Sequence, residues 1–75
     1  MIKLLIVDDE AIIRKGIRHY INWSEHDIEV VGEAANGKLG LHCALSLRPD
    51  IVVSDIRMPV MDGLSMAQEL RRLLK

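Results

Sequence analysis

The sequence is poor in the features that place a protein outside the cytoplasm or in a membrane. Cys43 is the single cysteine, so no disulfide can form within the chain, and one thiol fits a reducing compartment. No apolar run approaches the roughly 20 residues that span a bilayer. The apolar start of the chain, residues 1–7, is too short for the core of a signal peptide. We therefore expect a cytoplasmic protein without membrane contact.

A large excess of charge of either sign is missing as well, since the formal net charge is −1. A segment that holds DNA or an anionic membrane by electrostatics carries a basic excess. This segment is therefore not expected to bind DNA by itself. The histidines His19, His26 and His42 share no metal-ligand spacing and are expected at the surface.

The overall composition is that of a globular protein. The chain has 75 residues, of which 49% are hydrophobic and 28% charged. This length allows one domain at most, and so short a chain is only marginally stable when alone. Cys43 lies in an apolar, helix-like stretch and is expected to be a small buried side chain, with a reactive thiol as the alternative.

Short apolar runs alternate along the chain with patterns of helical spacing. Apolar runs rich in β-branched residues predict strands over residues 4–7, 28–34 and 51–53. Helices are predicted over residues 12–21, from Gly37 to Pro49, and over residues 66–74, with a loop over 22–27. This βαβαβα order indicates an α/β protein with a parallel sheet and right-handed crossovers. The predicted strand order is 2-1-3, with a topological switch point between the first and third strands.

Three acids stand at the ends of two predicted strands. Asp8 and Asp9 directly follow the first strand, and Asp55 follows the third, one residue past Ser54. Because these strands are neighbours, the carboxylates are expected to converge in one pocket. Like charges so close repel unless a cation joins them, and Mg²⁺ prefers a few carboxylates together with water and a phosphate. A carboxylate beside Mg²⁺ can act as a nucleophile towards a phosphoryl group.

A purely structural role is the alternative for each acid taken singly. An acid after a strand often caps the next helix, and Asp9 or Glu10 is placed to cap a helix that begins near Ala11. The three acids together, with Asp55 at the switch point, favour a metal site over this alternative.

Two stretches resemble the receiver domain of two-component response regulators. They are residues 4–10, LLIVDDE, and residues 49–63, PDIVVSDIRMPVMDG. The resemblance extends over the whole chain, including the sequence ANG at 35–37. It implies the flavodoxin-like (CheY-like) fold, a doubly wound parallel sheet of which residues 1–75 form the N-terminal part, a partial receiver domain.

The resemblance implies a role for each of four residues. Asp55 corresponds to the phosphoacceptor, Asp9 to a direct Mg²⁺ ligand and Asp8 to a ligand acting through water. The backbone carbonyl of Arg57 completes the protein ligands. The family is one of signalling modules rather than enzymes, and its phosphoryl donor is a sensor histidine kinase.

The segment at 21–23, INW, resembles receivers linked to AraC-type helix-turn-helix domains. That likeness implies a parent protein that regulates transcription and binds DNA through a domain outside this chain. Structurally, Trp23 is expected to anchor the loop at the end of the first helix.

The chain ends after the third predicted helix, whereas a whole receiver has five strands. The family's switch hydroxyl and phosphate-binding lysine follow the fourth and fifth strands and have no counterpart here, and the sequence contains no threonine. The third strand's outer edge and part of the first helix would then lack cover, so we expect a homodimer, with the third strands paired across a two-fold axis. The alternative is that the chain is part of a longer protein.

Two functions remain open at this point. The first is a receiver that takes a phosphoryl group from a histidine kinase onto Asp55 with Mg²⁺. The second is an interaction fragment that dimerises or docks without being phosphorylated. A phosphatase of the haloacid dehalogenase type also uses an Asp after a strand, but it expects a second acid two positions on, where Arg57 stands.

Overall fold

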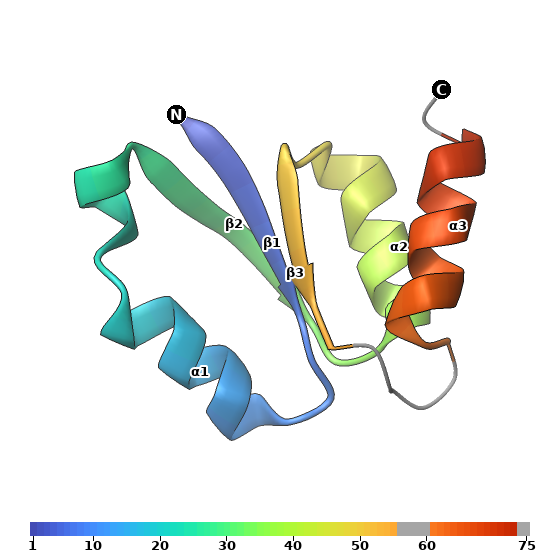
Figure 1. The fold of residues 1–75 in the computed structure, drawn as a ribbon, viewed down its shortest axis with the longest axis horizontal. Coiled ribbons are helices and arrows are strands. Elements are labelled where there is room, and N and C mark those ends of the chain that lie inside the picture. Colours follow the sequence, from blue (N-terminus) through green and yellow to red (C-terminus); the bar gives the residue numbers. More distant parts are fainter. Residues whose placement is uncertain (56–60, 74–75) are drawn as a thin grey trace.

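The structure, a computed structural model, describes residues 1–55 and 61–73. The elements in these ranges follow the predicted βαβαβα order, with one short 3₁₀ helix added (Figure 1). They are β1 (Ile2–Val7), α1 (Ala11–Tyr20), η1 (Trp23–His26), β2 (Ile28–Ala34), α2 (Gly37–Leu47), β3 (Ile51–Ser54) and α3 (Gly63–Leu73). The helix η1 lies in the segment that was predicted to be a loop.

The strands form one parallel sheet in the order β2-β1-β3, which confirms the predicted order and the flavodoxin-like, CheY-like fold. Helix α1 lies on one side of the sheet, and α2 and α3 lie side by side on the other (Figure 1). The central strand β1 is therefore sandwiched between helices, which explains why its sequence is apolar without alternation.

The core is built on the two faces of β1. Leu5 and Val7 are fully buried and form the core cluster beneath α2 and α3, which is completed by Ala34, Ala44 and Met66. Leu4 and Ile6 are also buried, and the alternation of side chains along a strand directs them to the opposite face, where α1 lies. Burial of each such side chain stabilises the fold by about 1.5–3 kcal/mol.

A register shift in the β1–β2 pairing decides which face the end of β2 presents to α1. Leu4 pairs with Val30, but Leu5 pairs with Gly32, so β2 contains one extra residue at this point. Beyond the shift, Glu33 is level with Ile6 and Ala34 with Val7. Glu33 therefore faces α1, while Ala34 enters the core beneath α2.

The helix ends follow local chemistry that the sequence carries. The Asn36 side chain accepts a hydrogen bond from the Leu39 N–H at 2.8 Å and so caps α2. At the other end, Arg48 adopts the left-handed conformation with φ 51°, directly before Pro49. Since a residue before proline avoids the right-handed helical region, α2 stops at Leu47.

One detail differs from the predicted packing. Cys43 is half-buried at the margin of the core rather than within it. In α3, Met66 is buried and Leu70 packs against the core, while Ala67 and Leu73 are exposed. No residue of α1 is fully buried, which agrees with the expectation that part of this helix lacks cover.

The predicted anchoring role of Trp23 is confirmed by its hydrogen bond. The indole Nε1–H donates to the Ile17 carbonyl in the last turn of α1 at 3.0 Å. This contact ties η1 back onto α1, because a partly buried indole N–H needs an acceptor.

Candidate functional site

The carboxyl ends of β1 and β3 lie side by side and carry three acids. The Asp8 N–H donates to the Ala34 carbonyl at 3.0 Å, and the Asp55 N–H donates to the Val7 carbonyl at 3.1 Å. Both residues are thus held by backbone hydrogen bonds to a neighbouring strand, directly at the switch point of the sheet. Their positions are fixed by the sheet rather than by loop conformation alone.

Asp8, Asp9 and Asp55 are brought together by this arrangement. Each offers one carboxylate oxygen, and these oxygens all lie within 4.8 Å of one another. Asp8 is 9% exposed, whereas Asp9 and Asp55 are open to solvent. Several carboxylate oxygens at one sheet edge, with room for water on one side, fit the hard, oxygen-seeking ion Mg²⁺. Without a cation, the three negative charges repel one another.

The alternative that Glu10 caps α1 through its side chain is wrong. Glu10 occupies the N-cap position of α1 but makes no side-chain capping hydrogen bond. Instead the Asp8 Oδ1 accepts a hydrogen bond from the Glu10 N–H at 2.9 Å. The carboxylate of Asp8 thus stabilises the turn that leads into α1 through its Oδ1.

The surroundings of Asp55 constrain its backbone closely. The Ser54 hydroxyl donates to the Asp55 carbonyl at 2.8 Å. A Cβ atom at Gly63 would collide with that same carbonyl oxygen. Gly63, the first residue of α3, therefore packs directly on the backbone of Asp55. Glycine is required at this position because the two residues approach closely, and not because of its φ angle.

Asp62 lies near this site in sequence but has a structural task. Its Oδ1 accepts a hydrogen bond from the Ser65 N–H at 2.8 Å, so it caps α3. This backbone hydrogen bond lowers the pKa of the Asp62 carboxyl below its ordinary value. Arg57, whose carbonyl was predicted as a metal ligand, lies outside the described residues.

The three histidines were predicted to lie at the surface and to share no metal-ligand spacing. Within residues 1–55 and 61–73, the carboxylates at the sheet edge are the one group of three potential metal ligands, and no histidine belongs to it. No helix in the described part of the chain is long and apolar enough to cross a membrane.

One group of charged residues beside the site was not predicted from the sequence. Glu33 accepts a hydrogen bond from Arg18 at 2.6 Å and lies 3.3 Å from the Arg14 Nε. The Arg18 hydrogen bond holds the pKa of the Glu33 carboxyl below its ordinary value. Arg14 and Arg18 both lie in α1. Their i,i+4 spacing puts them on one face, but their partner depends on the register of β2.

This sheet order, with three acids at the carboxyl ends of its strands, is that of a flavodoxin-like, CheY-like α/β fold. Residues 4–74 match the response regulator receiver domain family, and the chain therefore belongs to this family. Among curated proteins, a protein-glutamate methylesterase/protein-glutamine glutaminase of Methanococcoides burtonii is 43% identical over 72 residues. The match covers 96% of this chain and 20% of that protein.

Solved receiver structures agree with the fold in detail. The REC domain of AraT, a response regulator from Geobacillus stearothermophilus, is 50% identical with a TM-score of 0.90, over 96% of this chain and 56% of that chain. A two-component transcriptional regulator AraC from Clostridium phytofermentans is 32% identical with a TM-score of 0.86, over 99% and 60%. The chain thus spans a fifth of the methylesterase and 56–60% of these solved chains.

Proposed function

We propose that this chain is the phosphoacceptor module of a two-component system and that Asp55 accepts the phosphoryl group. The observation that carries the proposal is the convergence of the Asp8, Asp9 and Asp55 oxygens within 4.8 Å at the carboxyl edge of a parallel sheet. Membership of the receiver family supports the same role. Asp55 is the exposed member at the end of β3, so a phosphoryl donor can reach it from solvent.

The proposed reaction is a single phosphoryl transfer. A carboxylate oxygen of Asp55 attacks the phosphorus of a phosphohistidine on a sensor histidine kinase. The new P–O bond forms as the P–N bond breaks, and the electron pair returns to the imidazole nitrogen. The product is an acyl phosphate on Asp55, which adds negative charge at the edge of the sheet.

The metal ion in this proposal is Mg²⁺, held by the carboxylates of Asp8, Asp9 and Asp55 and by the backbone carbonyl of Arg57. When bound, it supplies positive charge that offsets the repulsion between the carboxylates and the incoming phosphoryl oxygens. Asp8 has one oxygen already engaged by the Glu10 N–H. This engagement suits Asp8 to a contact through water and leaves Asp9 as the direct ligand.

The proposal is tested by labelling with a small phosphoryl donor. Incubation of the chain with acetyl phosphate and Mg²⁺ is expected to add one phosphoryl group, observed as an increase in intact mass. Removal of Mg²⁺ with EDTA should abolish the addition, because three unscreened carboxylates repel the anionic donor. Absence of labelling at saturating Mg²⁺ in a folded sample would favour the interaction fragment instead.

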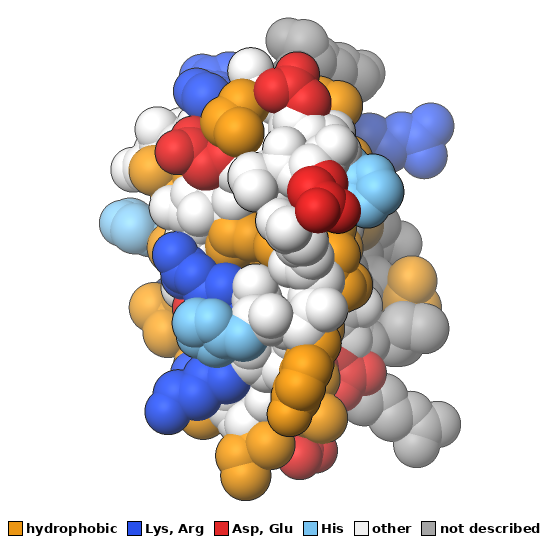
Figure 2. All heavy atoms as spheres, turned by 90° about the vertical axis from the view of Figure 1, so that its left-hand side faces the viewer, with side chains coloured by type: hydrophobic (Ala, Val, Ile, Leu, Met, Phe, Trp, Pro, Cys, Tyr) orange, Lys and Arg blue, Asp and Glu red, His pale blue; other side chains and the backbone are white. Residues whose placement is uncertain are grey.

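The parent protein in this proposal is a cytoplasmic regulator of transcription that binds DNA through a domain outside this chain. Similarity to the two-component transcriptional regulator AraC supports this output. The chain itself carries a net charge of −1, and the face that bears α1 shows basic, acidic and hydrophobic side chains intermixed (Figure 2). In this proposal the receiver is a signalling module and not an enzyme.

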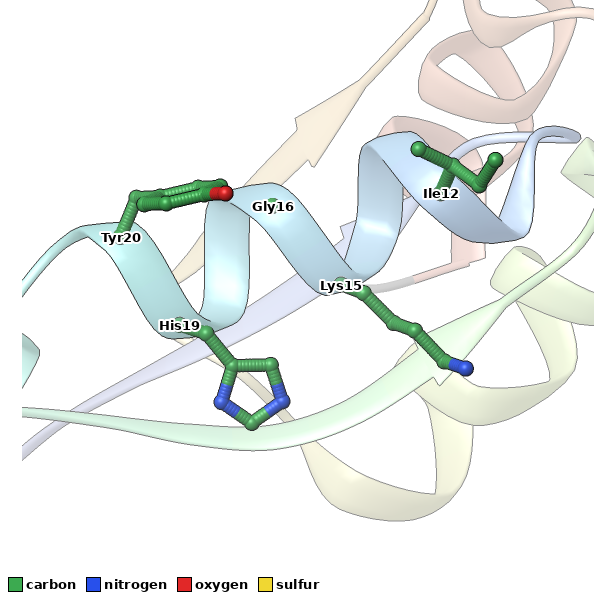
Figure 3. Close-up of a pocket in the computed structure, with 5 residues that line it drawn as sticks. All are labelled: Ile12, Lys15, Gly16, His19 and Tyr20. Atoms are coloured by element: carbon green, nitrogen blue, oxygen red, sulfur yellow. The ribbon is translucent and has the colours of Figure 1, made fainter.

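We also propose self-association, which is the second candidate function. In the described part of the chain, β3 pairs on one side only, with β1, and its residues Ile51 and Val53 are 40% and 36% exposed. On α1, Ile12 is 82% and Tyr20 92% exposed. They lie on one side of the helix with Gly16 between them (Figure 3). A second copy that pairs its β3 in antiparallel fashion would cover the strand edge.

The α1 surface contains a shallow pocket of ≈ 380 Å³ that belongs to this second candidate and not to the acidic site. It is lined by Ile12, Lys15, Gly16, His19 and Tyr20 (Figure 3). None of the three clustered carboxylates lines it. Apolar side chains this exposed on a short chain are typical of a surface that a second protein covers.

Self-association is tested by the mass in solution. Sedimentation equilibrium at micromolar concentration is expected to give a dimer, and Val53→Lys is expected to give a monomer because it places a charge on the strand edge. Glu29→Lys on β2, at the opposite edge of the sheet, is the control and should leave the dimer intact. A well-folded wild-type monomer at this concentration contradicts the proposal.

A further inference from the structure

The Arg14 side chain reaches from α1 to the backbone of the acidic site. Its Nη1 donates to the Asp8 carbonyl oxygen at 2.6 Å. The Arg14 N–H also donates to the Glu10 carbonyl at 3.1 Å, within the first turn of α1. One residue therefore clamps both ends of the turn from Asp8 to Glu10. That turn also contains Asp9.

The same guanidinium is held in place from the other side by Glu33. The Arg14 Nε lies 3.3 Å from a Glu33 carboxylate oxygen, and the Arg14 side chain is only 18% exposed. Arg18 binds the second oxygen of Glu33 at 2.6 Å. The planar fork of arginine can contact a carboxylate and a carbonyl at once, which a lysine ammonium does less well. Arg14 is thus oriented before any ion binds.

This arrangement keeps a positive charge beside the carboxylates without letting it compete with a metal ion. The Arg14 contact is with the Asp8 backbone oxygen and not with a carboxylate of the cluster. Glu33 offsets the charge locally, and its contacts with Arg18 and Arg14 lower the pKa of its carboxyl. The carboxylates of Asp8 and Asp9 therefore remain available while their backbone is held.

We propose that Arg14 is a positioning residue for the cation site, which fixes the Asp8–Glu10 turn so that the Asp8 and Asp9 carboxylates point to one ion. The inference rests on the proposed Mg²⁺ site. It predicts a change in Mg²⁺ affinity that is opposite in sign to the change expected from electrostatics alone. Loss of a nearby positive charge should by electrostatics alone strengthen Mg²⁺ binding, whereas loss of a positioning contact should weaken it.

The test compares Arg14→Gln with Arg18→Gln by calorimetric Mg²⁺ titration of the full chain. Both variants remove one positive charge and one Glu33 ion pair, but only Arg14→Gln removes the contact to the Asp8 carbonyl. We expect affinity for Mg²⁺ to fall roughly tenfold in Arg14→Gln and to stay unchanged or rise slightly in Arg18→Gln. The pair Arg14→Lys and Arg18→Lys repeats the comparison at constant charge, should Arg14→Gln fold poorly.

A second readout uses the ion-free protein. The Glu10 amide hydrogen, which is bonded to the Asp8 carboxylate, should exchange with solvent faster in the Arg14 variants than in the Arg18 variants. If the wild type binds Mg²⁺ and the Arg14 variants bind it as tightly or more tightly, the inference is overturned and the proposed function stands. If the wild type binds no Mg²⁺ at millimolar concentration, the proposed site fails, and the inference falls with it.

Discussion

Replacement of Asp55 by asparagine is expected to abolish phosphoryl labelling by acetyl phosphate while leaving the fold intact. The amide has nearly the same shape but lacks the anionic oxygen that would attack phosphorus. The Asp55 N–H bond to the Val7 carbonyl comes from the backbone, so the substitution preserves it. Without Mg²⁺, Asp55→Asn should also be more stable than the wild type, because one of three repelling carboxylates is gone.

Asp50→Asn is the matched control for this experiment. It removes one negative charge at the opposite end of β3, where the Asp50 Oδ2 accepts a hydrogen bond from the Lys3 N–H at 2.8 Å. Labelling should persist in this variant, since its carboxylate is not part of the cluster. Intact-mass measurement and thermal unfolding with and without Mg²⁺ read out both effects. Equal labelling of wild type and Asp55→Asn would place the modification on another residue.

The convergence of the acids could be predicted because it depends only on strand order and strand ends. Uninterrupted apolar residues in β1 indicate a strand buried on both faces, and the βαβ connections set the order 2-1-3. Once β1 and β3 are neighbours, Asp8 and Asp55 must meet at their carboxyl ends. The site thus follows from topology, without any knowledge of side-chain rotamers.

The ion pairs of Glu33 could not be predicted in the same way. The pattern of β2 alone does not reveal the extra residue between Val30 and Gly32, and without it Glu33 would be level with Val7 and face the core. A shift of one residue reverses the face to which every following side chain points. Contacts that depend on such a shift, including the link from Arg14 to Glu33, are set by tertiary packing.

The exposed state of α1 is a second feature that its amphipathic pattern did not settle. Apolar residues at helical spacing predict a helix with one apolar face but not how much of that face is covered, and Ile12 is 82% exposed. Helix α1 contacts the sheet through few residues of β1, whereas α2 packs on β1 and β2 and also against α3 (Figure 1). The pattern predicts the helix correctly, but within the described residues no element covers Ile12.

Substitution of Gly37 by alanine is expected to destabilise the chain strongly, although alanine is the better helix former. A Cβ atom at Gly37, the first residue of α2, would overlap the Met61 carbonyl oxygen. Overpacking of this kind typically costs about 1–3 kcal/mol. The total stability of a chain this short is roughly 4–11 kcal/mol by the usual value per residue. The sequence predicted only the start of a helix at this glycine.

Gly16→Ala in α1 is the control with the opposite expected sign. The nearest atom to a Cβ at Gly16 is in the Tyr20 ring at 3.6 Å, an ordinary contact distance. Alanine in an exposed helix should therefore raise the free energy of unfolding by about 0.5–1 kcal/mol. Urea denaturation followed by circular dichroism measures both variants. An equal increase in the free energy of unfolding of both variants would show that Gly37 and the Met61 carbonyl are not in close contact.

The Gly37 substitution should also affect the proposed phosphoacceptor site, because the contacts are continuous. Gly37 packs against the backbone of Met61, and Gly63, two residues further on, packs against the Asp55 carbonyl. A Met61 carbonyl displaced by a new methyl group must shift the segment that leads into α3 and so relax the backbone around Asp55. In the folded fraction of Gly37→Ala, labelling by acetyl phosphate is therefore expected to be slower than in Gly16→Ala. Unchanged labelling rates with lowered stability would show that the two glycine contacts act independently.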